Sequence, residues 1–132
     1  MVVFLCLVFT AHAETSLKFG GFSHHLITTD HTNYFHRTLM IEHNGFEFGY
    51  ARNSYDQDIF IAGIYFSNKL KSFTLKTHAG GVYGYSECYG KPIVGKRVLC
   101  PIIAPEIEFN LPYRPSVILF GDALVLNFNV WL

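Results

Sequence analysis

The chain has 132 residues, of which half are hydrophobic, 17% are aromatic and only 15% are charged. Soluble domains typically carry charge on roughly a quarter of their residues. Ten basic residues balance ten acidic ones, so there is no positive excess to neutralise phosphates, which argues against a nucleic-acid ligand. The length allows one domain.

The first predicted element is a signal peptide over residues 1–13, MVVFLCLVFTAHA. An apolar run leads into Ala11-His12-Ala13, the small-residue pattern that signal peptidase cleaves. No Lys or Arg precedes that run, so either the true start lies upstream or the signal is atypical, and an N-terminal core strand is the alternative. The bulky Leu5 excludes a lipoprotein signal at Cys6. We expect an exported protein whose outer-membrane β-barrel domain spans residues 14–132.

Blocks of period-two alternation between apolar and polar residues follow, separated by turn residues. They predict eight strands, at about 15–26, 37–43, 46–53, 58–67, 70–84, 101–109, 114–120 and 122–132. Turns are predicted at Asn44-Gly45, Ser67-Asn68-Lys69 and Gly121-Asp122. Asn-Gly supplies the positive φ angles of a two-residue hairpin, so neighbouring strands should pair antiparallel.

The two faces of the predicted strands differ in polarity. In the last strand, one face carries Leu124, Leu126, Phe128, Val130 and Leu132, and the other carries Val125, Asn127, Asn129 and Trp131. The polar faces of the other strands carry Glu42, Glu47, Lys76, His78, Glu106 and Glu108. An outward Lys or Arg at mid-bilayer costs about 2–4 kcal/mol, so a charge-free face suits lipid. The sequence predicts an all-β fold, an eight-stranded antiparallel transmembrane β-barrel with a polar lumen; a soluble lipocalin-like barrel is the alternative.

Two cysteines remain in the predicted mature chain, Cys88 and Cys100. An even pair in an exported protein indicates a disulfide, which by closing a loop of this size would add roughly 3 kcal/mol of stability. Two unrelated free thiols are the alternative.

Five of the seven histidines fall close together: His24, His25, His31, His36 and His43. His24 and His25 would point to opposite faces of a strand, and no Cys or carboxylate completes a set of three or four ligands. We therefore predict no metal site and no cofactor, and interpret these residues as loop and interface histidines.

Several short motifs follow one another in a recognisable order. They are Phe22-Ser23-His24-His25, Tyr34-Phe35-His36-Arg37, Arg52-Asn53-Ser54-Tyr55, Ile61-Ala62-Gly63-Ile64-Tyr65, Ala79-Gly80-Gly81-Val82 and Tyr113-Arg114-Pro115. In their order and spacing, over nearly all of residues 19–132, the chain resembles the lipid A palmitoyltransferase (PagP) family. The resemblance implies an outer-membrane barrel that moves a palmitoyl chain from a phospholipid to lipid A.

The resemblance also implies roles for single residues. His25, or alternatively His24, would be the catalytic histidine, and Ser54 its hydroxyl partner, because a neutral imidazole can accept the proton of a hydroxyl that attacks an ester. Asn53 stands where the family has Asp; its amide cannot hold an imidazolium by charge but can donate to an oxyanion. Ordinary turn chemistry is the alternative for Asn53 and Ser54.

Three further positions concern the substrate. Arg37 would bind substrate, or equally be a rim arginine that contacts lipid phosphate. If Gly63 is aligned with the family's acyl pocket, Tyr65 stands at the pocket floor. Its ring would fill the lower lumen, so the acyl chain accepted should be shorter than palmitate.

The leading hypothesis is thus a monomeric outer-membrane acyltransferase, exported through the periplasm, with phospholipid and lipid A as its ligands. Prolines around the sixth predicted strand remove ladder hydrogen bonds where a lateral opening of the barrel would be expected. One alternative is a non-enzymatic surface barrel in phage or host recognition. Another is a lipid A deacylase, although the sequence has no His-x-Ser strand motif to match one.

Overall fold

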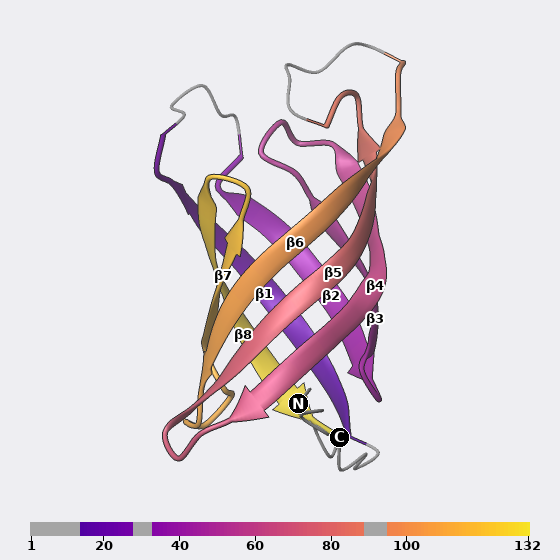
Figure 1. The fold of residues 1–132 in the computed structure, drawn as a ribbon. Coiled ribbons are helices and arrows are strands. Elements are labelled where there is room, and N and C mark those ends of the chain that lie inside the picture. The colour runs from indigo at the N-terminus through magenta and orange to yellow at the C-terminus, as the bar shows by residue number, and fades with distance from the viewer. Residues whose placement is uncertain (1–13, 28–32, 89–94) are drawn as a thin grey trace, which may run out of the picture.

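The computed structural model describes residues 14–27, 33–88 and 95–132, which form a closed barrel of eight antiparallel strands (Figure 1). The strands are β1 (Thr15–His25), β2 (Phe35–His43), β3 (Phe46–Arg52), β4 (Asp58–Lys69), β5 (Phe73–Tyr85), β6 (Val98–Phe109), β7 (Ser116–Phe120) and β8 (Ala123–Trp131). Each strand pairs with the next along the chain, and β8 pairs with β1 to close the barrel. The eight predicted strands are confirmed. The predicted signal peptide and His31 lie outside the described residues.

Two of the predicted turns are confirmed. Asn44 and Gly45 join β2 to β3 with φ angles of 49° and 82°, as a two-residue hairpin with two positive φ angles requires. Gly121, with a φ of 62°, and Asp122 join β7 to β8.

The third predicted turn is wrong. Ser67-Asn68-Lys69 belongs to β4, where Asn68 pairs with Leu75, and the chain turns at 70–72 instead. Ladder pairing with β5 outweighs the low strand propensity of Asn, as tertiary context often does.

The wall of the barrel separates a polar interior from an apolar exterior, as predicted. The charged side chains of Lys18, Glu42, Glu47, Lys76, His78, Glu106 and Glu108 are all buried. Large hydrophobic side chains face outward instead, among them Ile41, Phe48 and Ile103, which are 52%, 64% and 79% exposed. No helix in the described part of the chain is long and apolar enough to cross a bilayer.

The two ends of the barrel differ (Figure 1). One end, here called the turn end, carries the start of β1, the end of β8 and the tight β2–β3 turn. The opposite end, here called the loop end, carries the longer β1–β2, β3–β4 and β5–β6 connections and the β7–β8 hairpin.

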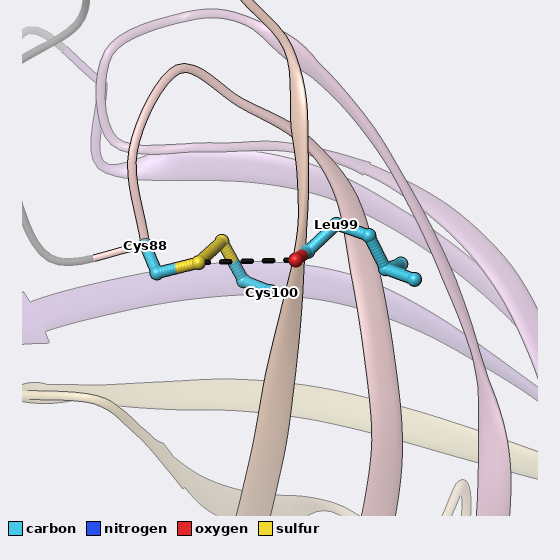
Figure 2. Close-up of a disulfide and its surroundings, with 3 residues drawn as sticks. All are labelled: Cys88, Leu99 and Cys100. Carbon is cyan, nitrogen blue, oxygen red and sulfur yellow. Dashed lines mark hydrogen bonds between the residues drawn. A yellow bond between two sulfur atoms is a disulfide. The ribbon is translucent and has the colours of Figure 1, made fainter.

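The predicted disulfide between Cys88 and Cys100 is confirmed, with Cα atoms 5.2 Å apart (Figure 2). It ties the β5–β6 connection to β6, where Cys100 is buried on the inner face. Cys88 Sγ also lies 3.9 Å from the carbonyl oxygen of Leu99. A disulfide sulfur carries no proton, so this approach is a van der Waals contact and the covalent bond is what holds the connection.

Candidate active site

A cavity of about 850 Å³ occupies the part of the lumen nearest the loop end. Its volume falls within the range of about 300–1,000 Å³ that is usual for ligand sites. The wall is built from apolar side chains on six strands: Met40, Ala51, Ile59, Ile61, Ile102, Ala104, Ile118 and Val125. Such a wall suits a hydrocarbon chain, because burying apolar surface is favourable.

Buried ion pairs close this cavity toward the turn end. Lys18 Nζ lies 2.7 Å from Glu42 and 2.6 Å from Glu106, and Lys76 Nζ lies 2.8 Å from both Glu42 and Glu108. We call the whole group the plug; it consists of Lys18, Glu42, Glu47, Lys76, His78, Glu106, Glu108 and Arg114. The plug joins β1, β2, β3, β5 and β6 across the lumen, and Lys18, Glu47 and His78 form the cavity floor.

His78 makes the plug electrically balanced. Its two ring nitrogens face carboxylate oxygens of Glu47 and Glu106. A neutral imidazole donates from only one nitrogen and carboxylates only accept, so this geometry favours the imidazolium. Lys18, Lys76, Arg114 and an imidazolium then match the four carboxylates of the plug.

At the loop end, a β-bulge directs His25 into the lumen. The pairing of β1 with both β2 and β8 shifts between Gly20 and Phe22, and Gly20 and Gly21 have φ angles of 117° and 95°. Because the bulge adds one residue, the inward face of β1 changes from even-numbered to odd-numbered positions. His25 therefore faces the lumen with a side chain only 6% exposed, whereas His24 is exposed.

Ser54 lies in the β3–β4 connection, which is held by backbone and side-chain hydrogen bonds. Asn53 Oδ1 accepts from the backbone N–H of Tyr55 (3.0 Å) and of Gln57 (2.9 Å), and Asn53 Nδ2 donates to Gln57 Oε1. Asn33 N–H donates to the carbonyl of Ser54 at 3.0 Å. The Asn53 side chain is thus engaged in shaping the loop that presents Ser54.

The structure brings His25 and Ser54 together. His25 Nε2 lies 2.9 Å from Ser54 Oγ, although 29 residues separate them in sequence. The other ring nitrogen of His25, Nδ1, lies 3.1 Å from Asp122 Oδ1. All three residues line the cavity at its mouth. A serine, a histidine and a carboxylate in this order are the elements of nucleophilic acyl transfer.

Asp122 was not among the residues singled out from the sequence. It lies in the β7–β8 turn. In the sequence, Gly121-Asp122 indicates only that a turn is present there. A carboxylate at a hairpin tip is common, and only the closure of β8 against β1 places it beside His25.

The other candidate residues lie away from the cavity. Arg37 is exposed at the start of β2, with a φ of 45°. Gly63 faces inward on β4 but meets the backbone of Gly80 and does not line the cavity. Tyr65 lies below the floor, where the plug Lys76 Nζ is 5.6 Å from its ring.

The cavity borders the seam between β6 and β7. Among the residues that the structure describes, these strands share only three residue pairs, from Glu106–Ile118 to Glu108–Ser116, and the loop-end half of β6 has no ladder partner on that side. Pro101, Ile102 and Ile103, which belong to that half of β6, line the cavity.

Among the described residues, Glu42, Glu47 and His78 bring potential metal-ligand atoms within 4.8 Å of one another. Each of them already takes part in an ion pair of the plug. The lysines and the imidazolium supply the positive charge that a cation would otherwise bring.

No protein-family model matches the chain, and no curated protein matches it in sequence. The fold and the geometry of the site therefore carry the functional interpretation.

Proposed function

We propose that this protein is an outer-membrane enzyme that moves an acyl chain from a phospholipid to lipid A. The observation that carries the proposal is the hydrogen-bonded pair of His25 and Ser54 at the mouth of an apolar cavity. The order of motifs that resembles the lipid A palmitoyltransferase family supports it. No cofactor is needed for this chemistry, because an ester already holds an activated acyl group.

The outer surface of the barrel supports a membrane location. Soluble proteins rarely expose large contiguous apolar surface, yet the outward positions of β2, β3 and β4 carry Leu39, Ile41, Phe46, Phe48, Phe60, Ile64 and Phe66. A closed barrel pairs every strand with both of its neighbours, so few backbone groups are left unpaired toward lipid, and the ion pairs lie inside the barrel, away from the apolar exterior. The longer connections at the loop end suit the outer face of the membrane, as in bacterial barrels generally.

In the proposed reaction, the donor's acyl chain enters the cavity and its ester lies at His25 and Ser54. Neutral His25 accepts the proton of the Ser54 hydroxyl through Nε2 and so activates this hydroxyl for attack on the ester. We propose that the acyl chain of a lipid in the outer leaflet enters the cavity laterally, between β6 and β7. The lipid then does not have to leave the bilayer to reach the cavity from the loop end.

The plug sets the length of chain that fits. β1 runs from Lys18 at the floor to His25 at the mouth. Because of the bulge, this stretch of β1 matches only six steps of β8, from Asn129 to Ala123. At about 3.3 Å per step and a tilt of about 40°, it spans about 15 Å of depth. With C–C bonds of about 1.5 Å, an extended chain advances about 1.3 Å per methylene, so about 12 carbons fill the cavity. We therefore propose a donor chain shorter than palmitate.

Hydrolysis is the second candidate. The same His25–Ser54 pair serves a lipid A deacylase if water replaces the acceptor hydroxyl, and the connection to Asp122 favours an ester-cleaving site of this kind.

Expression of the chain in the outer membrane, followed by mass spectrometry of lipid A, tests the proposal. Wild type is compared with Ser54→Ala and His25→Ala, and Ser67→Ala, an exposed serine near the turn end, is the matched control. Transfer predicts a mass gain smaller than a palmitoyl group that only the first two variants abolish. A mass loss with the same dependence identifies a deacylase. Unchanged masses in every strain contradict both and favour a surface barrel, and a full palmitoyl gain contradicts the short pocket.

A further inference from the structure

We infer that Asp122 is the positioning residue of a Ser54–His25–Asp122 triad and that Ser54 carries the acyl group as a covalent ester. The inference relies on the proposed function for the identity of the lipid donor. The reactivity of Ser54 rests separately on the geometry of the three side chains.

The contact with Asp122 determines which nitrogen of His25 carries the proton. A carboxylate only accepts hydrogen bonds, so Asp122 Oδ1, at 3.1 Å, selects the form with hydrogen on Nδ1. The lone pair of Nε2 then faces Ser54 Oγ at 2.9 Å and can accept its proton. The opposite tautomer would place a hydrogen where the base must be.

The backbone holds Asp122 in this position. Gly121, with a φ of 62°, forms the first central residue of the two-residue β7–β8 turn, a position where glycine is favoured. The N–H of Leu26, directly after His25, donates to the carbonyl of Asp122 at 2.9 Å. This hydrogen bond and the pairing of His25 with Ala123 hold the hairpin tip against the end of β1, next to the His25–Asp122 contact.

Asn53 is not placed for this role. Its Oδ1 accepts two backbone N–H groups and its Nδ2 donates to Gln57, so its side chain shapes the loop. The family that the chain resembles has an Asp at the position of Asn53. Here the carboxylate beside His25 belongs instead to Asp122, in the β7–β8 turn.

The inferred reaction has two balanced displacements. Ser54 Oγ attacks the ester carbonyl carbon while its proton passes to His25 Nε2; the ester C–O bond then breaks and the leaving alkoxide takes that proton. An acceptor hydroxyl next gives its proton to His25, attacks the acyl-Ser54 carbonyl and releases Ser54, which recovers the proton. Water in place of the acceptor gives the free fatty acid. Asp122 stays ionised and stabilises the imidazolium in both halves.

Covalent labelling tests the reactivity. The purified mature barrel in detergent micelles is treated with dodecyl fluorophosphonate, which forms a serine O–P bond with loss of fluoride, and the adduct is located by peptide mass spectrometry. We expect one adduct, on Ser54, and labelling slower by at least about 100-fold in Asp122→Asn. Asp56→Asn, which removes an exposed carboxylate at the same rim, should label at the wild-type rate. An adduct elsewhere, or wild-type labelling of Asp122→Asn, would overturn the inference.

A nitrogen-15 spectrum of the histidine rings gives a readout that needs no turnover. Wild type and Ser54→Ala should both show His25 with its proton on Nδ1, and Asp122→Asn should lose that preference. An unchanged tautomer in Asp122→Asn would contradict the positioning role. If Ser54 labels as expected while lipid A and phospholipid masses stay unchanged, the triad stands and the proposed lipid substrates do not.

Discussion

Lys18 and Glu106 form an ion pair of 2.6 Å across the lumen, joining β1 to β6 with neither side chain more than 1% exposed. Lys18 also pairs with Glu42, so a single ammonium connects three strands through the interior. The lumen is therefore blocked by charge rather than open as a channel, and the space above the block is the apolar cavity.

Loss of Lys18 should be strongly destabilising. Lys18→Met leaves Glu42 and Glu106 buried with one cation fewer, and breaking a buried pair from one side typically costs about 3–5 kcal/mol. Lys69→Met is the matched control, because Lys69 pairs with Glu14 at the surface, where an ion pair contributes about 0–1 kcal/mol. Urea unfolding of both variants in lipid vesicles measures the difference. Equal free energies of unfolding would contradict the role given to the plug.

A charge on the outer face should reveal whether that face contacts lipid. Ile41 is 52% exposed in the outward row of β2. Ile41→Arg should lower the free energy of unfolding from vesicles by about 2–4 kcal/mol if Ile41 lies near mid-bilayer. Leu111→Arg, in the β6–β7 turn at the end of the barrel, should cost about 0–1 kcal/mol. A tolerated Ile41→Arg would favour the soluble-barrel alternative.

The fold could be predicted because alternation is a local signal. In β5, Lys76 and His78 alternate with Leu75 and Thr77, and the structure places the first two inside and the others outside. Which lysine meets which glutamate could not be read in the same way, since those contacts depend on the tilt and closure of the whole barrel.

The β1 bulge should decide which histidine reaches Ser54. Gly21→Val cannot keep a φ of 95°, and a Cβ there would lie 2.5 Å from Thr38 Oγ1. If β1 becomes regular, His24 turns inward and His25 outward, and fluorophosphonate labelling of Ser54 should be lost. We also expect a loss of stability of about 1–3 kcal/mol.

Deletion of Gly21 is the matched variant for the bulge. The deletion removes the extra residue of the bulge, whereas Gly21→Val keeps that residue and forces it into the regular strand. After the deletion, the odd-numbered residues beyond Gly20 still face inward, so His25 should keep its orientation and labelling should persist. Loss of labelling in both variants, with the barrel still folded, would show that the bulge does not set the orientation of His25.

The intact mass of the expressed protein tests the predicted signal-peptide cleavage and the disulfide together. Cleavage after Ala13 and a Cys88–Cys100 bond predict a chain that begins at Glu14 and takes up no alkylating reagent until it is reduced. Reduction should then expose both thiols. A retained residue 1–13 segment would contradict the signal peptide, and alkylation without reduction would contradict the disulfide.

The site was harder to predict than the fold because its parts come from distant turns. Ser54 and a nearby histidine could be proposed from motifs, but His24 and His25 could not be distinguished without knowing that Gly20-Gly21 forms a bulge. Asp122 lies 97 residues from His25 and carries no motif of its own. The sequence contains two local signals, a Gly-Gly pair inside a strand and a carboxylate at a hairpin tip. They indicate the site only when the pairing of β1 with β8 is known.

The central claim is that Ser54 and His25 cleave a lipid ester whose chain lies in the cavity. Its most direct test is the release of lysophospholipid from phosphatidylethanolamine by the purified barrel in mixed micelles with lipid A. We predict release with donor chains of about 12 carbons, slower with palmitoyl chains, and reduced by about 100-fold or more in Ser54→Ala and His25→Ala. The same rate in wild type and both variants would contradict the account.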